Sequence, residues 1–319
     1  MVIAGPNLTI DRTSTIPELG PGEVLRFEDV AVTPGGKGVN VARVARALAA
    51  PAVLVGFVPG HTGHAAGAML ADEGVELRGV SAPGELRATI VVLERSGRVT
   101  VINEPGPRVE RADWERFEAA IADELRSHRV LTCSGSAPPG APRDAYARLV
   151  ALARGRGAVA IVDANGPLLS EAVGAGADLV SPNLAEAEGV LGRGGYEAVE
   201  HDDPVAARAR AAAAAVDLTA RGAGAGLVTA GSAGAAFSAA GETWWHPASR
   251  LTVRNPIGAG DSVVGGIAVA LERGEDLRAA VRFGLAAGAA SVETAKAGVV
   301  DPARVAELLC AAPPAERLR

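Results

Sequence analysis

The feature that most constrains the fold is an alternation, from about residue 40 onward, of short apolar runs with longer amphipathic stretches. Short apolar runs bounded by turn signals are typical of buried strands, and apolar residues every three or four positions are typical of helices. Strands that alternate with helices predict an α/β fold with helices on both faces of a largely parallel sheet. We expect strands at 52–57, 130–133, 158–162, 179–180 and 226–229, and helices near 64–73, 112–127, 142–155, 184–191, 204–221 and 262–273.

Two segments do not fit this alternation. One covers residues near 10–33, and the other runs from 88–94 through a turn at Ser96-Gly97 into 99–102. The second segment reads as a β-hairpin. Together the two segments predict a small sheet apart from the alternating strands.

Composition narrows the class of protein. The chain has 319 residues, of which 48% are hydrophobic and 21% charged, so it can bury a large core. A formal charge of −6 without a basic cluster argues against nucleic acid as a partner. The longest apolar runs fall short of the roughly 18 residues that span a bilayer, and the two distant cysteines, Cys133 and Cys310, suit a reducing compartment. We therefore expect a cytoplasmic protein without a membrane partner.

The most informative motif is the segment 255–262, in which a carboxylate follows a turn of small residues and precedes an apolar helix. Gly258, Ala259 and Gly260 leave backbone N–H groups free at a helix N-terminus, which attracts the phosphates of a nucleotide. Asp261 would then accept the proton of an attacking hydroxyl group. The alternative is a glycine turn in which Asp261 only caps the helix.

A second glycine-rich motif, Pro34-Gly35-Gly36-Lys37-Gly38-Val39-Asn40, opens a helix near the start of the chain. It is not a Walker A loop, because position 31 is Ala and Gly38 stands where Ser or Thr would bind magnesium. Close approach of a ligand to the backbone would explain the glycines, and a plain helix-start turn is the alternative. We expect both glycine motifs to follow the carboxyl ends of strands, where α/β sheets bind ligands.

These two motifs, in this order, resemble the two signatures of the ribokinase-like sugar kinases of the phosphofructokinase B type. The segments 103–107, 134–140 and 181–186 lie between them in the family's order, and segments 7–11 and 22–26 resemble the branch of 1-phosphofructokinase and tagatose-6-phosphate kinase. The resemblance implies a three-layer αβα fold with a central, mostly parallel sheet and a small β-sheet lid. It assigns residues 1–9, 34–86 and 106–319 to the large domain, and 10–33 and 87–105 to the lid.

The resemblance also implies the activity, which is ATP-dependent phosphorylation of a hydroxyl of a ketohexose monophosphate. Conversion of fructose 1-phosphate to fructose 1,6-bisphosphate is the first choice, and tagatose-6-phosphate kinase or 6-phosphofructokinase activity is an alternative. A kinase of a free sugar or nucleoside remains open, as does a non-catalytic sugar-phosphate sensor. A sensor would not need the carboxylate of Asp261.

Site residues follow from the same resemblance. The catalytic set is Asp261 with Gly258, Ala259 and Gly260. The sugar phosphate would be bound by Asp11, Arg26, Gly35, Gly36, Lys37, Asn40, Arg87 and Ser136. The nucleotide would be bound by Asn183, Thr229, Gly231, Gly234, Gly258 and Gly260. Glu186 would organise Mg²⁺ through water, which suits a cation that keeps much of its hydration shell; helix capping by Asn183 and Glu186 is the alternative.

The sequence departs from the family pattern at the acceptor site. Where the hexose-phosphate branch has Thr-Arg-x-Asn-x-Lys, this chain has Leu86-Arg87-Ala88-Thr89-Ile90-Val91, so a phosphate-binding cation is replaced by Val91. This change leaves the acceptor open. An exposed apolar face on the lid would need cover, so we expect a homodimer that pairs lid against lid.

Overall fold

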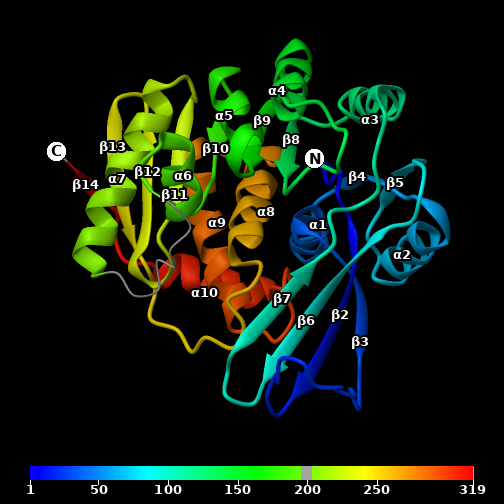
Figure 1. The fold of residues 1–319 in the computed structure, drawn as a ribbon. Helices are drawn as coiled ribbons and strands as arrows, with labels where there is room; N and C mark the ends of the chain where they lie inside the picture. Colours follow the sequence, from blue (N-terminus) through cyan, green and yellow to red (C-terminus); the bar gives the residue numbers. More distant parts are fainter. Residues whose placement is uncertain (195–202, 319) are drawn as a thin grey trace.

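The structure, a computed structural model, describes residues 1–194 and 203–318 and contains one large and one small β-sheet (Figure 1). The strands are β1 (Val2–Ala4), β2 (Thr9–Ile16), β3 (Ala31–Gly35), β4 (Val53–Phe57), β5 (Leu77–Val80), β6 (Arg87–Glu94), β7 (Val99–Asn103), β8 (Val130–Ser134), β9 (Val159–Asp163), β10 (Leu179–Val180), β11 (Ala225–Thr229), β12 (Gly234–Ala239), β13 (Glu242–Pro247) and β14 (Glu316–Leu318). The helices are α1 (Lys37–Ala47), α2 (Gly60–Asp72), α3 (Arg111–Glu124), α4 (Ala145–Gly155), α5 (Gly166–Gly174), α6 (Leu184–Leu191), α7 (Pro204–Ala220), α8 (Ala259–Glu272), α9 (Leu277–Val292) and α10 (Pro302–Ala311). The predicted α/β fold is confirmed.

The large sheet determines where a ligand can bind. Its strand order is β14-β13-β12-β11-β10-β9-β8-β1-β4-β5, and the strands from β11 to β5 are parallel. From β1 the chain proceeds first to β4 and β5 on one side and later to β8 through β11 on the other. Such a reversal opens a crevice at the carboxyl ends of the two strands that flank it, here β1 and β8.

Successive strand residues pack alternately into two separate cores, one on each face of the sheet, as a sheet covered on both faces requires. On β1, Val2 and Ala4 belong to the core beneath α3 to α7, whereas Ile3 belongs to the core beneath α1, α2, α8, α9 and α10. In the first core Phe117 stacks with Phe57, and the ring of Trp114 is tilted against both. The helices therefore form the outer two of three layers.

The small sheet has the order β3-β2-β6-β7 and projects from the body of the molecule (Figure 1). It contains both segments that break the βα alternation, including the predicted hairpin of β6 and β7. Asp11, Thr89 and Asn103 pair across three strands and face the cleft. Residues of adjacent strands that pair share a face of the sheet, so the neighbouring positions of these strands face away from the cleft.

Two expectations need correction. The glycine motifs do not follow strands of the large parallel sheet, because Gly35 ends β3 of the small sheet and Gly258 follows an irregular segment after the antiparallel strand β13. A third region also breaks the alternation, since β12, β13 and β14 form an antiparallel edge of the large sheet. Ala-rich β12 lacks the polar and apolar alternation that would have marked it as a strand.

Two negative expectations can be compared with the described residues. Within the described residues, 1–194 and 203–318, no helix is both long and apolar enough to cross a bilayer. Cys133 is fully buried in the core of β8, and this burial raises the pKa of its thiol, which suits a packing role. Cys310 is exposed on α10.

Candidate active site

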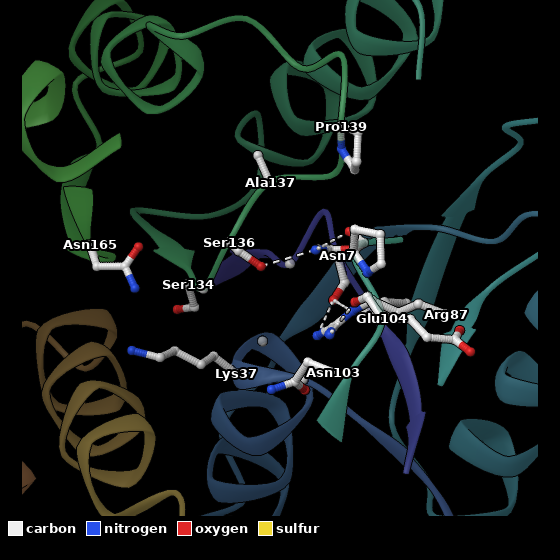
Figure 2. A pocket seen from close by; sticks show the side chains of 16 residues that line it. Asn7, Lys37, Arg87, Asn103, Glu104, Ser134, Ser136, Ala137, Pro139 and Asn165 are labelled. Atoms are coloured by element: carbon white, nitrogen blue, oxygen red, sulfur yellow. Dashed lines mark hydrogen bonds between the residues drawn. The ribbon is translucent and has the colours of Figure 1, made fainter. Parts of the chain in front are cut away.

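Two adjoining cavities of about 610 and 430 Å³ lie at the carboxyl edge of the large sheet, beneath the small sheet. Both are lined by Gly36, Lys37, Arg87 and Asn103, so they form one continuous cleft. Figure 2 shows the larger cavity, with Ser134, Ser136 and Asn165 on one side and Arg87 and Glu104 on the other. The smaller cavity ends at Asp261 and the turn before α8.

Asp261 is a buried carboxylate that lines the cleft, with 5% of its surface exposed in the first turn of α8. Its Oδ2 accepts a 2.7 Å hydrogen bond from Nδ2 of Asn40. Burial, followed by the nearby negative charge of Asp163, raises the pKa of Asp261 to about 7, against the opposing effects of Lys37 and Asn40. A carboxylate with this pKa can take up a proton near neutral pH, as a general base must.

The start of α8 presents the features of an anion site. Gly258 precedes the helix in the left-handed conformation, with φ of 78°. The N–H of Ala259 donates to the carbonyl of Pro256 over 3.3 Å, while those of Gly260 and Asp261 have no acceptor in the described part of the chain. A side chain at Gly260 would meet no protein atom within 4 Å, so packing does not require glycine there. The open space and free donors can accommodate a phosphate group.

Lys37 joins two further carboxylates of the cleft. Its Nζ lies 2.9 Å from Oδ1 of Asp163 and 3.5 Å from Oε1 of Glu186. Burial opposes the charge of Lys37, but Asp163, Glu186 and Asp261 outweigh it and raise the lysine pKa. The lysine side chain therefore points toward Asp163 and Glu186 and away from Arg87 (Figure 2), the residue expected to bind the sugar phosphate.

Glu186 has two roles within one side chain. Its Oε2 accepts from the N–H of Asn183 at 3.0 Å, and Oδ1 of Asn183 accepts from the N–H of Glu186 at 2.9 Å. This capping box begins α6, as the alternative interpretation expected. Burial and Asp163 raise the pKa of Glu186, although Lys37 opposes them. The capping box leaves Oε1 facing the cleft.

The donor set of this region fits magnesium. Oδ2 of Asp163 is buried without a hydrogen-bond partner among the described residues, and such an atom needs a ligand or water. Mg²⁺ is bound through one or two carboxylates and keeps several waters. Asp163 and Glu186 could hold it in that manner, each while contacting Lys37.

The first glycine motif shapes the other wall. A Cβ at Gly35 would overlap the carboxylate of Asp11, and Gly36 has a φ of 109° that disfavours other residues. Burial raises the pKa of Asp11 despite the opposing Arg87 and Arg43, and its Oδ1 is buried without a partner in the described structure. Asp11 can therefore accept a hydrogen bond from a ligand hydroxyl.

Arg87 lies where the two cavities adjoin, because it lines both of them. Nε and Nη2 donate to the carbonyl of Asn7, both at 3.3 Å, and Nη1 donates to the carbonyl of Glu104 at 3.2 Å. Because guanidinium has five N–H donors, two of them, one on each terminal nitrogen, have no acceptor among the described residues. Ser136 is close by, since its hydroxyl accepts from Nδ2 of Asn7 at 3.0 Å (Figure 2). This pair of donors suits a phosphate.

Only some of the residues that were expected to bind the nucleotide lie together at the cleft. Thr229 and Asn183 form a bridge between neighbouring strands, and Thr229 lines the smaller cavity. Gly231 is exposed beyond it, in the turn before β12. Gly234 has a packing requirement, because a Cβ there would lie 2.8 Å from the ring of Trp245. Arg26 is exposed in the loop between β2 and β3 and does not line the cleft formed by the described residues.

Several cleft residues were missed from the sequence. Asp163 is the most important, and its only signal was its position directly after the buried strand run 158–162. Polar residues that follow buried parallel strands point to the ligand edge of the sheet. Further lining residues that were not assigned are Asn7, Thr89, Asn103, Glu104, Ser134 and Asn165.

Comparison with known proteins gives a consistent family. Residues 6–304 match the pfkB family of carbohydrate kinases. The 1-phosphofructokinase of Rhodobacter capsulatus is 30% identical over 307 residues, 95% of this chain and 93% of the relative. The ATP-dependent 6-phosphofructokinase isozyme 2 of Escherichia coli is 30% identical over 285 residues, 89% of each protein. The crystal structure of Escherichia coli phosphofructokinase-2 with potassium superposes with a TM-score of 0.86 at 26% identity, covering 98% of both chains.

The resemblance inferred from the motifs is therefore confirmed by a family match over most of the chain. The fold agrees with it, because the αβα layers and the small projecting sheet correspond to those of a ribokinase-like kinase. The cleft agrees as well, since a buried carboxylate adjoins a helix start with free N–H groups. The chain belongs to the pfkB family of carbohydrate kinases and is an ATP-dependent sugar kinase.

Proposed function

We propose that this enzyme phosphorylates a hydroxyl group of a ketohexose monophosphate, with fructose 1-phosphate to fructose 1,6-bisphosphate as the leading reaction. The observation that carries the proposal is the continuous cleft, which brings Asp261 and Arg87 together among the residues that line its smaller cavity. Arg87 supplies two unused donors for an existing phosphate, while Asp261 receives the hydroxyl proton. A sugar phosphate bound between them would place its phosphate at Arg87 and its acceptor hydroxyl at Asp261.

The chain's own residues account for the proton transfer. Asp261 accepts the proton of the acceptor hydroxyl as the oxygen attacks the terminal phosphate of ATP. Asn40 holds the carboxylate through Nδ2, and Asp11 orients the sugar through its unpartnered oxygen. The free N–H groups at Gly260 and at Asp261 itself stabilise the charge on the transferring phosphate.

Lys37, Asp163 and Glu186 organise the polyphosphate side. Magnesium, when bound, would neutralise charge on the ATP phosphates, and Asp163 and Glu186 are the residues that would hold it. Lys37 keeps the two carboxylates together and provides positive charge beside Asp261. Asn183 and Thr229 border the same cavity and would contact the nucleotide.

The choice of acceptor rests on Arg87 and on the position of Val91. Val91 lies two residues beyond Thr89 on the cleft face of β6, where the family's lysine would give a second cation. Relatives at 30% identity include both a 1-phosphofructokinase and a 6-phosphofructokinase, so fructose 6-phosphate and tagatose 6-phosphate are the next acceptors to test. Loss of the lysine favours a free sugar or nucleoside as a further candidate.

A coupled assay of ADP release tests the proposal. Phosphorylated and free ketohexoses should be compared at equal concentrations, with ATP and Mg²⁺ in excess. We expect fructose 1-phosphate to give the highest kcat/KM and free fructose the lowest. Higher kcat/KM for a free sugar would contradict the sugar-phosphate assignment. Binding of the sugar phosphate without any ADP release would instead support a non-catalytic sensor.

We also propose that the small sheet acts as the lid and that two copies pair through it. Val32, Ile90 and Ile102 lie on β3, β6 and β7 on the face opposite Asp11, with exposed fractions of 38%, 37% and 54%, and Arg12 of β2 lies between Val32 and Ile90. Exposed apolar residues on one face favour a self-complementary interface. Because the proposed reaction uses a sugar phosphate and ATP, we expect the enzyme in the cytoplasm.

Sedimentation velocity tests the pairing of lids. Ile102→Asp should convert a dimer to a monomer, because it places a charge among the exposed apolar residues of the lid. Val216→Asp is a matched control, since Val216 is 43% exposed on α7, away from the lid. A monomeric wild type, or an Ile102→Asp variant that stays dimeric, would contradict lid pairing.

A further inference from the structure

A buried arginine stands behind the active site. Arg43 lies one turn after Asn40 in α1, with only 5% of its surface exposed. It is absent from the described residues that line the two cavities, so it would not touch a ligand there. Burying a guanidinium is costly unless its donors find acceptors. The partners of Arg43 therefore indicate what this position requires.

The guanidinium of Arg43 connects three parts of the fold. Nε and Nη2 donate to the two carboxylate oxygens of Glu73, at 2.6 and 2.8 Å, in a bidentate ion pair. Nη2 also donates to the carbonyl of Pro34 at 2.8 Å, directly before the first glycine motif. Nη1 donates to Oδ1 of Asn40 at 3.3 Å. Lys296, from the loop after α9, lies 3.1 Å from Glu73 and adds a second cation.

Arg43 fixes which end of the Asn40 amide faces the base. An asparagine side chain has one acceptor end and one donor end. Because Arg43 donates to Oδ1, the Nδ2 group is turned to Asp261, where it donates over 2.7 Å. With the amide reversed, its oxygen would face the carboxylate, and two acceptors repel each other.

The space around Asn40 is also restricted. A Cβ at Gly258 would lie 3.2 Å from Nδ2 of Asn40, and one at Gly298 would lie 2.7 Å from its Cα. Backbone on both sides thus packs closely against this residue. Within this narrow space, the hydrogen bond from Arg43 and the hydrogen bond to Asp261 favour the same amide orientation.

We propose that Arg43, anchored by Glu73, is a positioning residue for phosphoryl transfer, which holds the Asn40 amide in the orientation that donates to Asp261. It also anchors the turn at Pro34 that leads into the substrate wall. The inference rests on the proposed function, because it takes Asp261 as the base. The hydrogen bond from Arg43 to Asn40 is the contact that links this ion pair to the base.

The variant Arg43→Lys tests this role. Lysine keeps a cation beside Glu73 but lacks the planar fork that reaches three acceptor groups at once. We expect kcat to fall on the order of 10- to 100-fold, as for a misplaced catalytic group, with the KM for ATP nearly unchanged. The acidic limb of the kcat profile should move to higher pH, since ionised Asp261 loses a hydrogen-bond donor. The other charged groups that face Asp261, Asp163 and Lys37, are retained.

A double-mutant cycle separates positioning from general stability. In the Asn40→Ala background, Arg43→Lys should lower kcat no further, because Asn40 carries the effect. Arg148→Lys is the matched control, since Arg148 pairs with Glu118 at 2.7 Å between α4 and α3, and its kcat should equal that of the wild type. Additive losses, or a wild-type kcat and pH profile for Arg43→Lys, would overturn the proposal.

Two further experiments keep the test of Arg43 separate from a failure to fold and from a failure of the proposed function. If Arg43→Lys does not fold, the double variant Arg43→Met with Glu73→Gln leaves no unpaired buried charge and is judged by the same criteria. If the wild type phosphorylates no sugar, the proposed function fails, and Arg43 is tested by a crystal structure of Arg43→Lys. Loss of the 2.7 Å contact between Asn40 and Asp261 would support its role, and retention would overturn it.

Discussion

Nζ of Lys37 lies 2.9 Å from Oδ1 of Asp163 and thereby joins the first glycine motif to the end of β9. The pair leaves the other oxygen of Asp163 without a partner among the described residues. With Glu186 and Asp261 nearby, the catalytic end carries more carboxylates than cations. An excess of negative charge at this point favours the binding of a divalent cation together with ATP.

The buried charge of Asp261 should destabilise the protein as pH rises. Its pKa is raised from 3.8 to about 7, so the folded state retains a proton that the unfolded state has already released. Stability from this group is complete below pH 3.8 and is lost as pH rises through about 7. Asp261→Asn removes that loss, so its melting temperature should exceed that of the wild type at pH 8.5 by a few degrees, and by less at pH 5.5.

Thermal unfolding at the two pH values checks this prediction. Asp72→Asn, on the exposed face of α2, is the control and should show no comparable change in the gap. If the melting temperature of Asp261→Asn exceeds that of the wild type by the same amount, or by less, at pH 8.5 than at pH 5.5, the result would be inconsistent with a raised pKa of Asp261.

Glu186→Gln should change the magnesium requirement more than the fold. Glutamine can still accept the N–H of Asn183, so the capping box of α6 persists. The charge beside the metal position is lost, and the activity should need more Mg²⁺ and be partly restored at high concentration. A magnesium titration of the ADP-release rate measures this. An unchanged titration would leave Glu186 with a capping role alone.

Arg87→Ala should weaken the binding of a phosphorylated acceptor. Loss of a charged, hydrogen-bonded contact corresponds to roughly 2–4 kcal/mol in the apparent KM of the sugar phosphate. The KM for ATP should barely change, because the proposed contact of Arg87 is with the phosphate of the sugar and not with the nucleotide. Steady-state kinetics with one sugar in phosphorylated and free form separate a phosphate contact from a general disturbance of the Asn7 and Glu104 backbone.

Val91→Lys is the complementary gain of charge. The new ammonium would extend from the cleft face of β6, two residues beyond Thr89. It should lower the KM of phosphorylated sugars and leave that of free sugars unchanged. If Arg87→Ala does not affect the phosphorylated sugar and the free sugar is the better substrate, a free-sugar or nucleoside kinase replaces the sugar-phosphate assignment.

The parts of the structure that could be predicted share a local cause. Buried parallel strands are continuous apolar runs, so 53–57 and 130–134 were located to within a residue, and the Ser96-Gly97 turn revealed the hairpin. The parts that could not be predicted depend on partners distant in sequence. Arg43 looks like any solvated helix residue until Glu73, 30 positions later, is seen against it. Asp163 likewise resembles an ordinary strand end until Lys37 contacts it.

The most direct test of the central claim is the turnover of Asp261→Asn. Asparagine fits beside Asn40 and should leave the fold and ATP binding intact, but it cannot accept the hydroxyl proton. ADP release with the best acceptor should therefore fall by about 10²–10⁴-fold, with ATP affinity near that of the wild type by calorimetry. A purified, folded Asp261→Asn variant that retained more than about a tenth of wild-type turnover would contradict the role of Asp261 as the base.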